Sequence, residues 1–175
     1  MAKRTSLILK TMNVLFWIIF IGLCIQTGTI LYSYLISMFV NPAASNNLYM
    51  NLNLSELYKF NITHYSAIVL MHSFLTGLKA YIAFCVVKIF MELKLEKPFS
   101  EGINDIISKI SRFAVRAAVL AIAAQAYSDW LLSNGIVVPI NWAYSEILFF
   151  AGVIYIIALI FKKGIELQSE NELTV

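Results

Sequence analysis

Four long apolar stretches, separated by short polar segments, dominate the chain. They cover about residues 12–40, 66–90, 113–133 and 142–161. Each can cross the ~30 Å hydrocarbon core of a bilayer, which requires about 20 helical residues. Only helices and closed barrels satisfy every backbone polar group in lipid, and the sequence lacks the many short alternating strands of a barrel. The pattern therefore predicts an all-α, integral membrane four-helix bundle, with residues 1–175 as a single transmembrane domain.

The first stretch is longer than a membrane crossing needs. A helix over Met12–Val40 would rise about 43 Å, so we expect it to tilt or to extend beyond the membrane surface. A secretory signal peptide is the alternative interpretation, because Lys3, Arg4 and Lys10 precede the apolar run. The apolar core of a signal peptide has only about 7–15 residues. We therefore interpret this stretch as a membrane span.

Composition agrees with a membrane protein. The chain is 60% apolar and 13% charged, with a mean hydropathy of +0.77, whereas soluble domains are about 45–50% apolar and about 25% charged. These values exclude intrinsic disorder, and a net charge of +3 is too small to indicate direct nucleic-acid binding. Cys24 and Cys85 lie in separate apolar stretches, so no disulfide framework is expected.

Basic residues gather on one side of the predicted membrane. Eleven of the thirteen lie at the N-terminus, around the second connection or after the fourth span, whereas the other two connections hold only Lys59. By the positive-inside rule, both termini of this multi-pass protein face the cytoplasm. Four aromatic residues are expected at the outer interface, as in an aromatic belt: Tyr127, Trp130, Trp142 and Tyr144.

The first outer connection, residues 41–65, alternates apolar and polar residues through Asn51–Ser55. A period of two predicts a short extended segment, which would be either a strand lying over the bundle or part of a solvated spacer.

The second connection contains start and stop signals for helices. Pro98 halts the preceding helix, and Ser100 is placed to cap the next, with Glu101 in its first turn. Four isoleucines then fall on one helical face: Ile103, Ile106, Ile107 and Ile110. This pattern predicts a short cytoplasmic interfacial helix between the second and third spans. It would be either a connector at the membrane surface or a docking face for a cytoplasmic partner.

Two cytoplasmic motifs resemble a known family. Leu95–Glu101 reads LEKPFSE, and Phe161–Val175 reads FKKGIELQSENELTV. Both resemble the small four-span bacterial membrane proteins of the family called domain of unknown function 2975, whose tail usually has Asp where this chain has Glu172. The resemblance implies the bacterial inner (plasma) membrane and no established activity. Similar proteins are often encoded beside very small helix-turn-helix regulators, which implies such a cytoplasmic partner. The partner-docking candidates are Pro98, Phe99, Ser100, Leu173, Thr174 and Val175.

Charged residues at membrane depth are the candidates for a binding site. Lys79 lies near the middle of the second span, where a charge is costly by a few kcal/mol, and His72 shares its helical face. Asp129 and Glu146 lie about one turn inside the outer ends of the third and fourth spans, and Gln125 is also at membrane depth. Convergence of these residues would form an outward-facing polar pocket, with Lys79 at its floor and the carboxylates at its rim. The alternatives are a structural ion pair of Lys79 with Asp129 or Glu146, and proton-coupled transport.

Enzyme signatures are missing from the sequence. It contains no HExxH or GxSxG motif, no phosphate-binding glycine-rich loop and no Cys/His metal spacing, so we expect no catalytic residues, metal or cofactor. The favoured hypothesis is a non-enzymatic sensor or regulatory partner in the lipid bilayer. The alternative is a small transporter or ion-conducting protein, acting as a homo-oligomer, that uses Lys79 with Asp129 or Glu146.

Overall fold

The computed structural model describes residues 2–93 and 100–172, which form helices joined by turns and loops. This confirms the prediction of an all-α protein. The helices of the described part, in chain order, are α1 (Ala2–Phe39), the 3₁₀ helix η1 (Pro42–Asn46), α2 (Ser55–Phe60), α3 (Ile62–Glu92), α4 (Glu101–Ser133) and α5 (Tyr144–Glu172).

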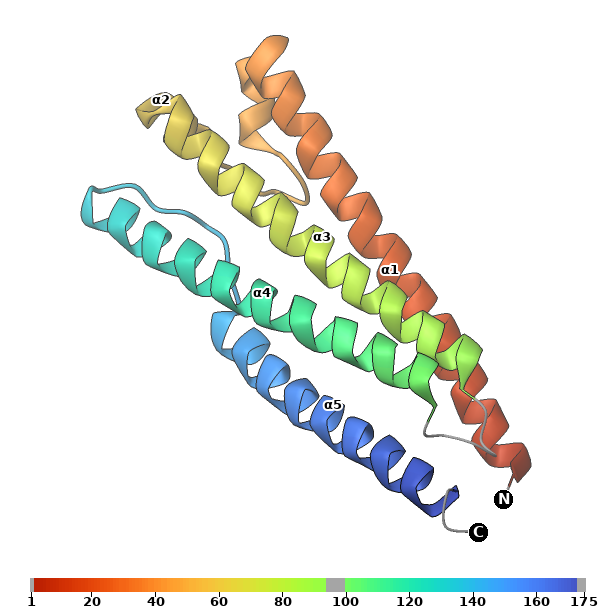
Figure 1. Cartoon of the computed structure of the whole chain (residues 1–175). Helices are drawn as coiled ribbons and strands as arrows, with labels where there is room; N and C mark the ends of the chain where they lie inside the picture. Colours follow the sequence, from red (N-terminus) through yellow and green to blue (C-terminus); the bar gives the residue numbers. More distant parts are fainter. Residues whose placement is uncertain (1, 94–99, 173–175) are drawn as a thin grey trace.

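The four long helices lie side by side in the order α1, α3, α4 and α5 (Figure 1). Each contacts its neighbours in this order, and within the described residues the backbones of α1 and α5 do not come close to each other. The start of α1, the end of α3, the start of α4 and the end of α5 lie together at one end of the molecule, here called the terminal end (Figure 1). The opposite end, which carries η1 and α2, is called the loop end.

Three of the described helices are long and apolar enough to cross a membrane. They contain Leu7–Phe39 of α1, Ile62–Glu92 of α3 and Tyr144–Gln168 of α5. Many large apolar side chains on them are exposed, including Phe149, as expected for surfaces that face lipid. α4 is not in this group, because its first half carries several charges and its commonest residue is the weakly apolar alanine.

α4 is one continuous helix that includes the segment predicted as an interfacial helix. The Ser100 hydroxyl accepts a hydrogen bond from the Ile103 backbone N–H, which confirms the predicted cap. The four isoleucines are buried against residues of α3 and α5. The predicted interfacial segment is therefore the first part of α4 and runs into the third predicted span, and its position at a membrane surface stays a prediction. No helix breaker follows Gly102 before Ser133, and the isoleucine face packs inside the layer, where it is not free to dock a partner.

The first outer connection contains turns and short helices, so the predicted strand is absent from these described residues. Met50 and Asn51 have positive φ angles of 43° and 66°, and the Asn47 side chain accepts a hydrogen bond from the Asn51 backbone N–H. Asparagine side chains stabilise turns in this way. The alternation does predict which side chains are covered, because Leu52 is half-buried and Leu54 is buried while Asn51 and Asn53 are exposed.

The last connection folds back into the molecule. Gly135, with a φ of +82°, reverses the chain after α4, and the following apolar residues pack against the main core. The segment then enters α5 through Ala143, whose φ of +50° is uncommon for a residue other than glycine. Ile147 packs beside Ala118, about 22 Å along α4 from Ser133. α5 therefore starts near the middle of α4 (Figure 1).

This return places Trp142 in the protein interior. Its side chain is fully buried, and its indole N–H donates a hydrogen bond of 2.8 Å to the Ser128 hydroxyl. The prediction that Trp142 belongs to an interfacial aromatic belt is therefore wrong. A connection of about ten residues looked like a simple loop between two spans, but its extended backbone is long enough to run back along α4.

Candidate functional site

A cavity of about 310 Å³ contains the charged residue at the centre of α3. Its lining includes Lys79 of α3, Ala117 of α4, Phe16 of α1 and Phe150 of α5. The backbones of α1 and α5 do not come close to each other in the described chain, and the cavity lies where side chains of both helices meet those of α3 and α4. We call this space the Lys79 cavity.

Glu146 brings the opposite charge into the Lys79 cavity. It lies in the first turn of α5, where the helix dipole favours a carboxylate, and accepts a hydrogen bond from the Ser145 hydroxyl. The two charges attract each other. Within the part of the chain that the structure describes, however, Lys79 forms no direct salt bridge. A half-buried ammonium group therefore faces a carboxylate across space that another polar group could occupy.

His72 extends this polar region along α3, two helical turns from Lys79. Its ring packs edge-on against Trp142, with 5.7 Å between the ring centroids. Its Nδ1 atom is buried and has no hydrogen-bond partner among the described residues, a rare condition for a buried polar atom. The positive charge of Lys79 acts on the imidazole. His72, Lys79 and Glu146 therefore form one connected electrostatic region.

Asp129 and Gln125 lie outside this region. The Gln125 amide donates a hydrogen bond of 2.8 Å to the Asp129 carboxylate, on the exposed side of α4. Asp129 follows Ala117, which lines the Lys79 cavity, by twelve residues, or about 18 Å along the helix. The predicted arrangement with both carboxylates at the rim is therefore not formed. The inward return before α5 puts Glu146 at the depth of Lys79, whereas Asp129 stays near the loop end.

The docking candidates are only partly described. Ser100 caps α4, as shown above, whereas Pro98, Phe99, Leu173, Thr174 and Val175 lie outside the described residues. α5 extends to Glu172, so the fourth long helix continues through the polar residues after Phe161.

Sequence reasoning missed the interior role of Trp142, although a signal was present. Ile136, Val138, Ile140 and Trp142 alternate with more exposed residues, the period expected for an extended segment with one buried face.

A second missed group lies at the loop end. His64 Nδ1 is hydrogen-bonded to the Tyr127 hydroxyl, and the Tyr127 ring stacks on Trp130 with 5.8 Å between centroids. The sequence places His64 in the first outer connection and the other two residues in the third span, so nothing in it indicated that they meet.

The chemistry of the Lys79 cavity is that of binding. Within the described residues, no group of three or more His, Cys, Asp or Glu side chains could hold a metal ion. The cavity offers one ammonium group, one carboxylate and otherwise apolar walls. Such a site can hold a molecule with an apolar body and a single polar head.

Comparison with known proteins shows the family but no relative of known activity. No curated protein and no solved structure significantly matches the chain. Residues 53–175, which are more than two thirds of the chain, match the model of one family. The matched residues include α3, α4 and α5, and with them Lys79 and Glu146. The chain belongs to the family described as Protein of unknown function (DUF2975).

Proposed function

We propose that this protein is a non-enzymatic sensor or regulatory partner in the bacterial inner membrane, with all four long helices crossing the bilayer and both termini in the cytoplasm. The common position of the start of α1, the end of α3, the start of α4 and the end of α5 supports an even number of crossings (Figure 1). The basic residues of these segments then lie on the cytoplasmic side. α4 carries no charged residue between Ala117 and Ser128, and the long side chain of Arg116 can reach the membrane interface.

The observation that carries the functional proposal is the ammonium group of Lys79, which forms no salt bridge within the described residues and lies in a cavity whose walls, apart from Glu146, are apolar. An ionised group in such surroundings needs a partner. Polar contacts between helices in membranes contribute only about 0.6–2 kcal/mol each, so stability is a weak reason to place a lysine there. We infer that the Lys79 cavity binds an amphipathic molecule whose acidic or hydrogen-bond-accepting head contacts Lys79 and whose apolar body lies between α1 and α5.

The position of Glu146 suggests how binding would be passed on. An acidic head on Lys79 would compete with Glu146, which lies in the first turn of α5. α5 packs on α4, and its backbone does not come close to that of α1 in the described chain, so we expect it to shift relative to α1 more readily than relative to α4. Its far end lies at the terminal end, where a cytoplasmic regulator would read the change.

The proposal can be tested with three ligands of equal chain length and different heads: decanoate, decylammonium and decanol. Binding to the purified protein is measured by native mass spectrometry. We expect decanoate to bind about tenfold more tightly than the other two, and Lys79→Met to remove this preference. Lys162→Gln is the matched control, because it removes an exposed lysine far from the cavity. Equal binding of all three ligands, or an unchanged preference in Lys79→Met, would contradict the proposal.

The sensing step has a separate readout. Spin labels at positions 10 and 167, on exposed sites of α1 and α5, report the separation of these helices by pulsed electron paramagnetic resonance. The labels are placed in a variant in which serine replaces both cysteines. Decanoate is expected to change the distance distribution in the otherwise unchanged protein but not in Lys79→Met. Binding without a change in distance would identify a ligand site that does not signal through α5.

A further inference from the structure

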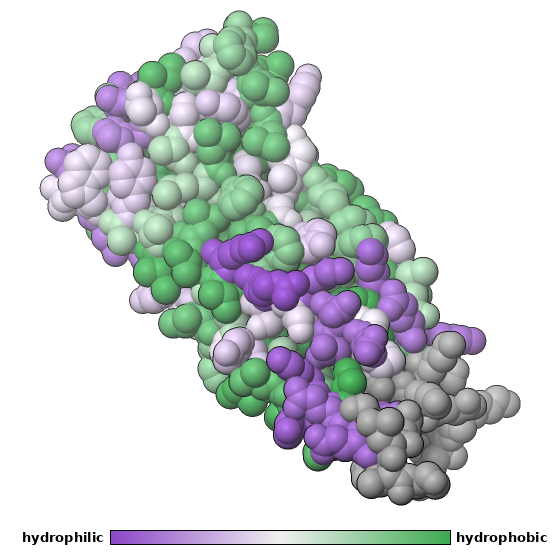
Figure 2. Space-filling view, viewed as in Figure 1, coloured by the Kyte–Doolittle hydropathy of each residue, from purple (hydrophilic) through white to green (hydrophobic). Residues whose placement is uncertain are grey.

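A second pocket, of about 210 Å³, lies between α3 and α4 near the terminal end. Four charged side chains line it, two basic and two acidic: Lys88, Lys109, Glu92 and Asp105. Figure 2 shows hydrophilic residues gathered on this face toward the terminal end. We call this space the Lys88 pocket. It is separate from the Lys79 cavity, with which it shares no lining residue.

The four charges of the Lys88 pocket do not neutralise one another by direct contact. Within the described residues, none of them forms a salt bridge, although all four face the same small space. The pocket therefore offers two ammonium groups and two carboxylates to a bound molecule. Their charges sum to zero, so the complementary ligand carries one group of each sign.

The charges are also ordered along the helices. On α3, Lys88 precedes Glu92 by one helical turn, and on the antiparallel α4, Lys109 follows Asp105 by one turn. Both lysines are consequently about 6 Å farther from the terminal end than the carboxylates. A ligand that fits this order has its anion on the membrane side and its cation on the side of the terminal end.

Gly102 keeps the acidic side of the pocket open. A Cβ atom at this position would lie 3.2 Å from a carboxylate oxygen of Glu92. The Glu92 carboxylate therefore lies against the first turn of α4, where the helix dipole favours a negative charge.

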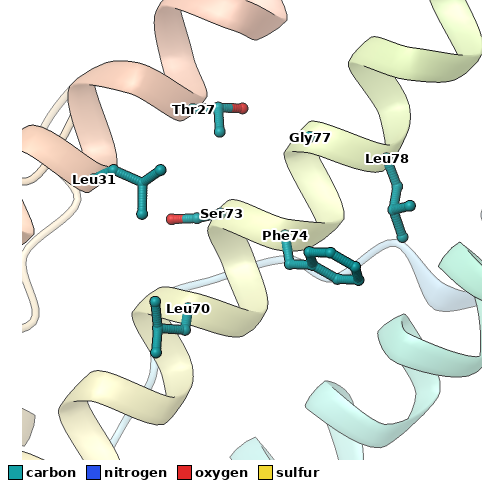
Figure 3. A pocket seen from close by; sticks show the side chains of 7 residues that line it. All are labelled: Thr27, Leu31, Leu70, Ser73, Phe74, Gly77 and Leu78. Carbon is teal, nitrogen blue, oxygen red and sulfur yellow. The ribbon is translucent and has the colours of Figure 1, made fainter.

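An apolar groove begins beside the Lys88 pocket. Tyr81 lines both the pocket and a groove between α1 and α3. The groove continues past Gly77 to Leu70 (Figure 3). From Phe84 to Leu70 it follows α3 for about 21 Å, compared with about 15 Å for one leaflet of the hydrocarbon core. A lipid chain can therefore lie in the groove while its headgroup occupies the pocket.

We propose that the Lys88 pocket and the adjoining groove bind an aminophospholipid, a lipid whose headgroup carries a phosphate and a primary ammonium group. The phosphate accepts hydrogen bonds from Lys88 and Lys109, and the ammonium group donates to Glu92 and Asp105. A headgroup with an anion alone would leave both carboxylates without a cation. A quaternary ammonium headgroup has no N–H to donate, so it binds the carboxylates less well. The inference does not depend on the function proposed for the Lys79 cavity.

The experiment compares three phospholipids with identical acyl chains and ethanolamine, choline or glycerol headgroups. Delipidated full-length protein in detergent is titrated with each lipid, and native mass spectrometry gives the affinity of the first bound lipid. We expect the ethanolamine lipid to bind about tenfold more tightly than the other two. Lys88→Gln combined with Lys109→Gln should weaken its binding about tenfold. Glu92→Gln combined with Asp105→Asn should remove the preference for ethanolamine over glycerol.

Two controls and one steric variant complete the test. Lys10→Gln and Glu101→Gln each neutralise an exposed charge that does not line the pocket, so lipid binding should not change. Gly77→Leu adds a side chain where nothing lies within 4 Å of the new Cβ. It should leave helicity intact but weaken all three lipids alike by filling the groove.

Four results would each overturn the proposal. They are equal affinity for the three headgroups, tighter binding of the glycerol lipid, unchanged binding in either charge variant, and unchanged binding in Gly77→Leu. The soluble compound glycerophosphoethanolamine distinguishes a lipid site from a site for a free headgroup. If it displaces the ethanolamine lipid at equal concentration, the acyl chain contributes nothing and the site is not a lipid site.

Discussion

The buried indole of Trp142 is expected to fix the depth at which α5 begins. It is the last large side chain of the returning segment, and it is fully buried. It joins that segment to α4 through Ser128 and to α3 through His72. Replacing Trp142 by alanine removes all of these contacts. Replacing it by phenylalanine keeps much of the ring volume but removes the hydrogen bond.

The expected loss of stability differs between the two variants. In soluble proteins, Trp→Ala in a core costs about 3–5 kcal/mol. In a membrane, part of this term disappears, because the unfolded chain also lies among apolar lipid tails, whereas lost packing contacts are not replaced. We therefore expect about 2–4 kcal/mol for Trp142→Ala. Trp142→Phe should cost about 1–2 kcal/mol, because interhelical hydrogen bonds in membranes are worth about 0.6–1.7 kcal/mol.

The assay is unfolding by sodium dodecyl sulfate in mixed micelles, followed by far-ultraviolet circular dichroism. Trp130→Phe is the matched control, since Trp130 is 48% exposed and should change stability by less than about 0.5 kcal/mol. A double-mutant cycle with Ser128→Ala isolates the hydrogen bond. If Trp142→Phe costs no more than Trp130→Phe, or if Trp142→Phe and Ser128→Ala are strictly additive, Trp142 does not anchor the segment.

Three further predictions concern topology, charge and backbone. In intact cells and a cysteine-free background, an impermeant thiol reagent should label a cysteine at position 47 but not one at position 104, and the reverse pattern would refute the proposed orientation. Glu146→Gln should lower the thermal unfolding temperature in detergent more than Lys79→Met does, because only the first leaves an ammonium group without its counter-charge; equal changes would show that the two charges are independent. Gly135→Ala should cost about 1 kcal/mol in the unfolding assay, because the φ of +82° is strained for alanine, and an unchanged midpoint would exclude this cost.

Local chemical signals made much of the fold predictable. The long apolar run of α1, the Ser100 cap of α4 and the continuation of α5 to Glu172 follow from hydropathy, capping and the absence of proline in the tail. These features depend on residues close together in the sequence. Their interactions are the same whatever the rest of the chain does.

The features that sequence analysis missed depend on contacts between distant segments. Asp129 and Glu146 occupy similar positions in their predicted spans. They lie at different positions along α4 only because the chain runs back along α4 to Trp142 before α5 begins. The isoleucines of α4 carried a correct signal for a buried face, but the sequence could not show whether lipid or the helices α3 and α5 cover it. The sequence therefore predicted Lys79, His72 and Glu146 as members of the candidate site, but it also included Gln125 and Asp129, which lie outside it.

The neighbour-to-neighbour arrangement of the helices has a consequence for biogenesis. α3 packs on α1, α4 packs on α3, and α5 packs on α4, so with the four proposed crossings each long helix meets its partner as soon as it enters the membrane. In a closed ring, the first helix would have to wait for the last one before its second interface formed. Here the described chain requires no such delayed contact, and assembly can proceed in the order of synthesis, with each new helix added to the growing edge.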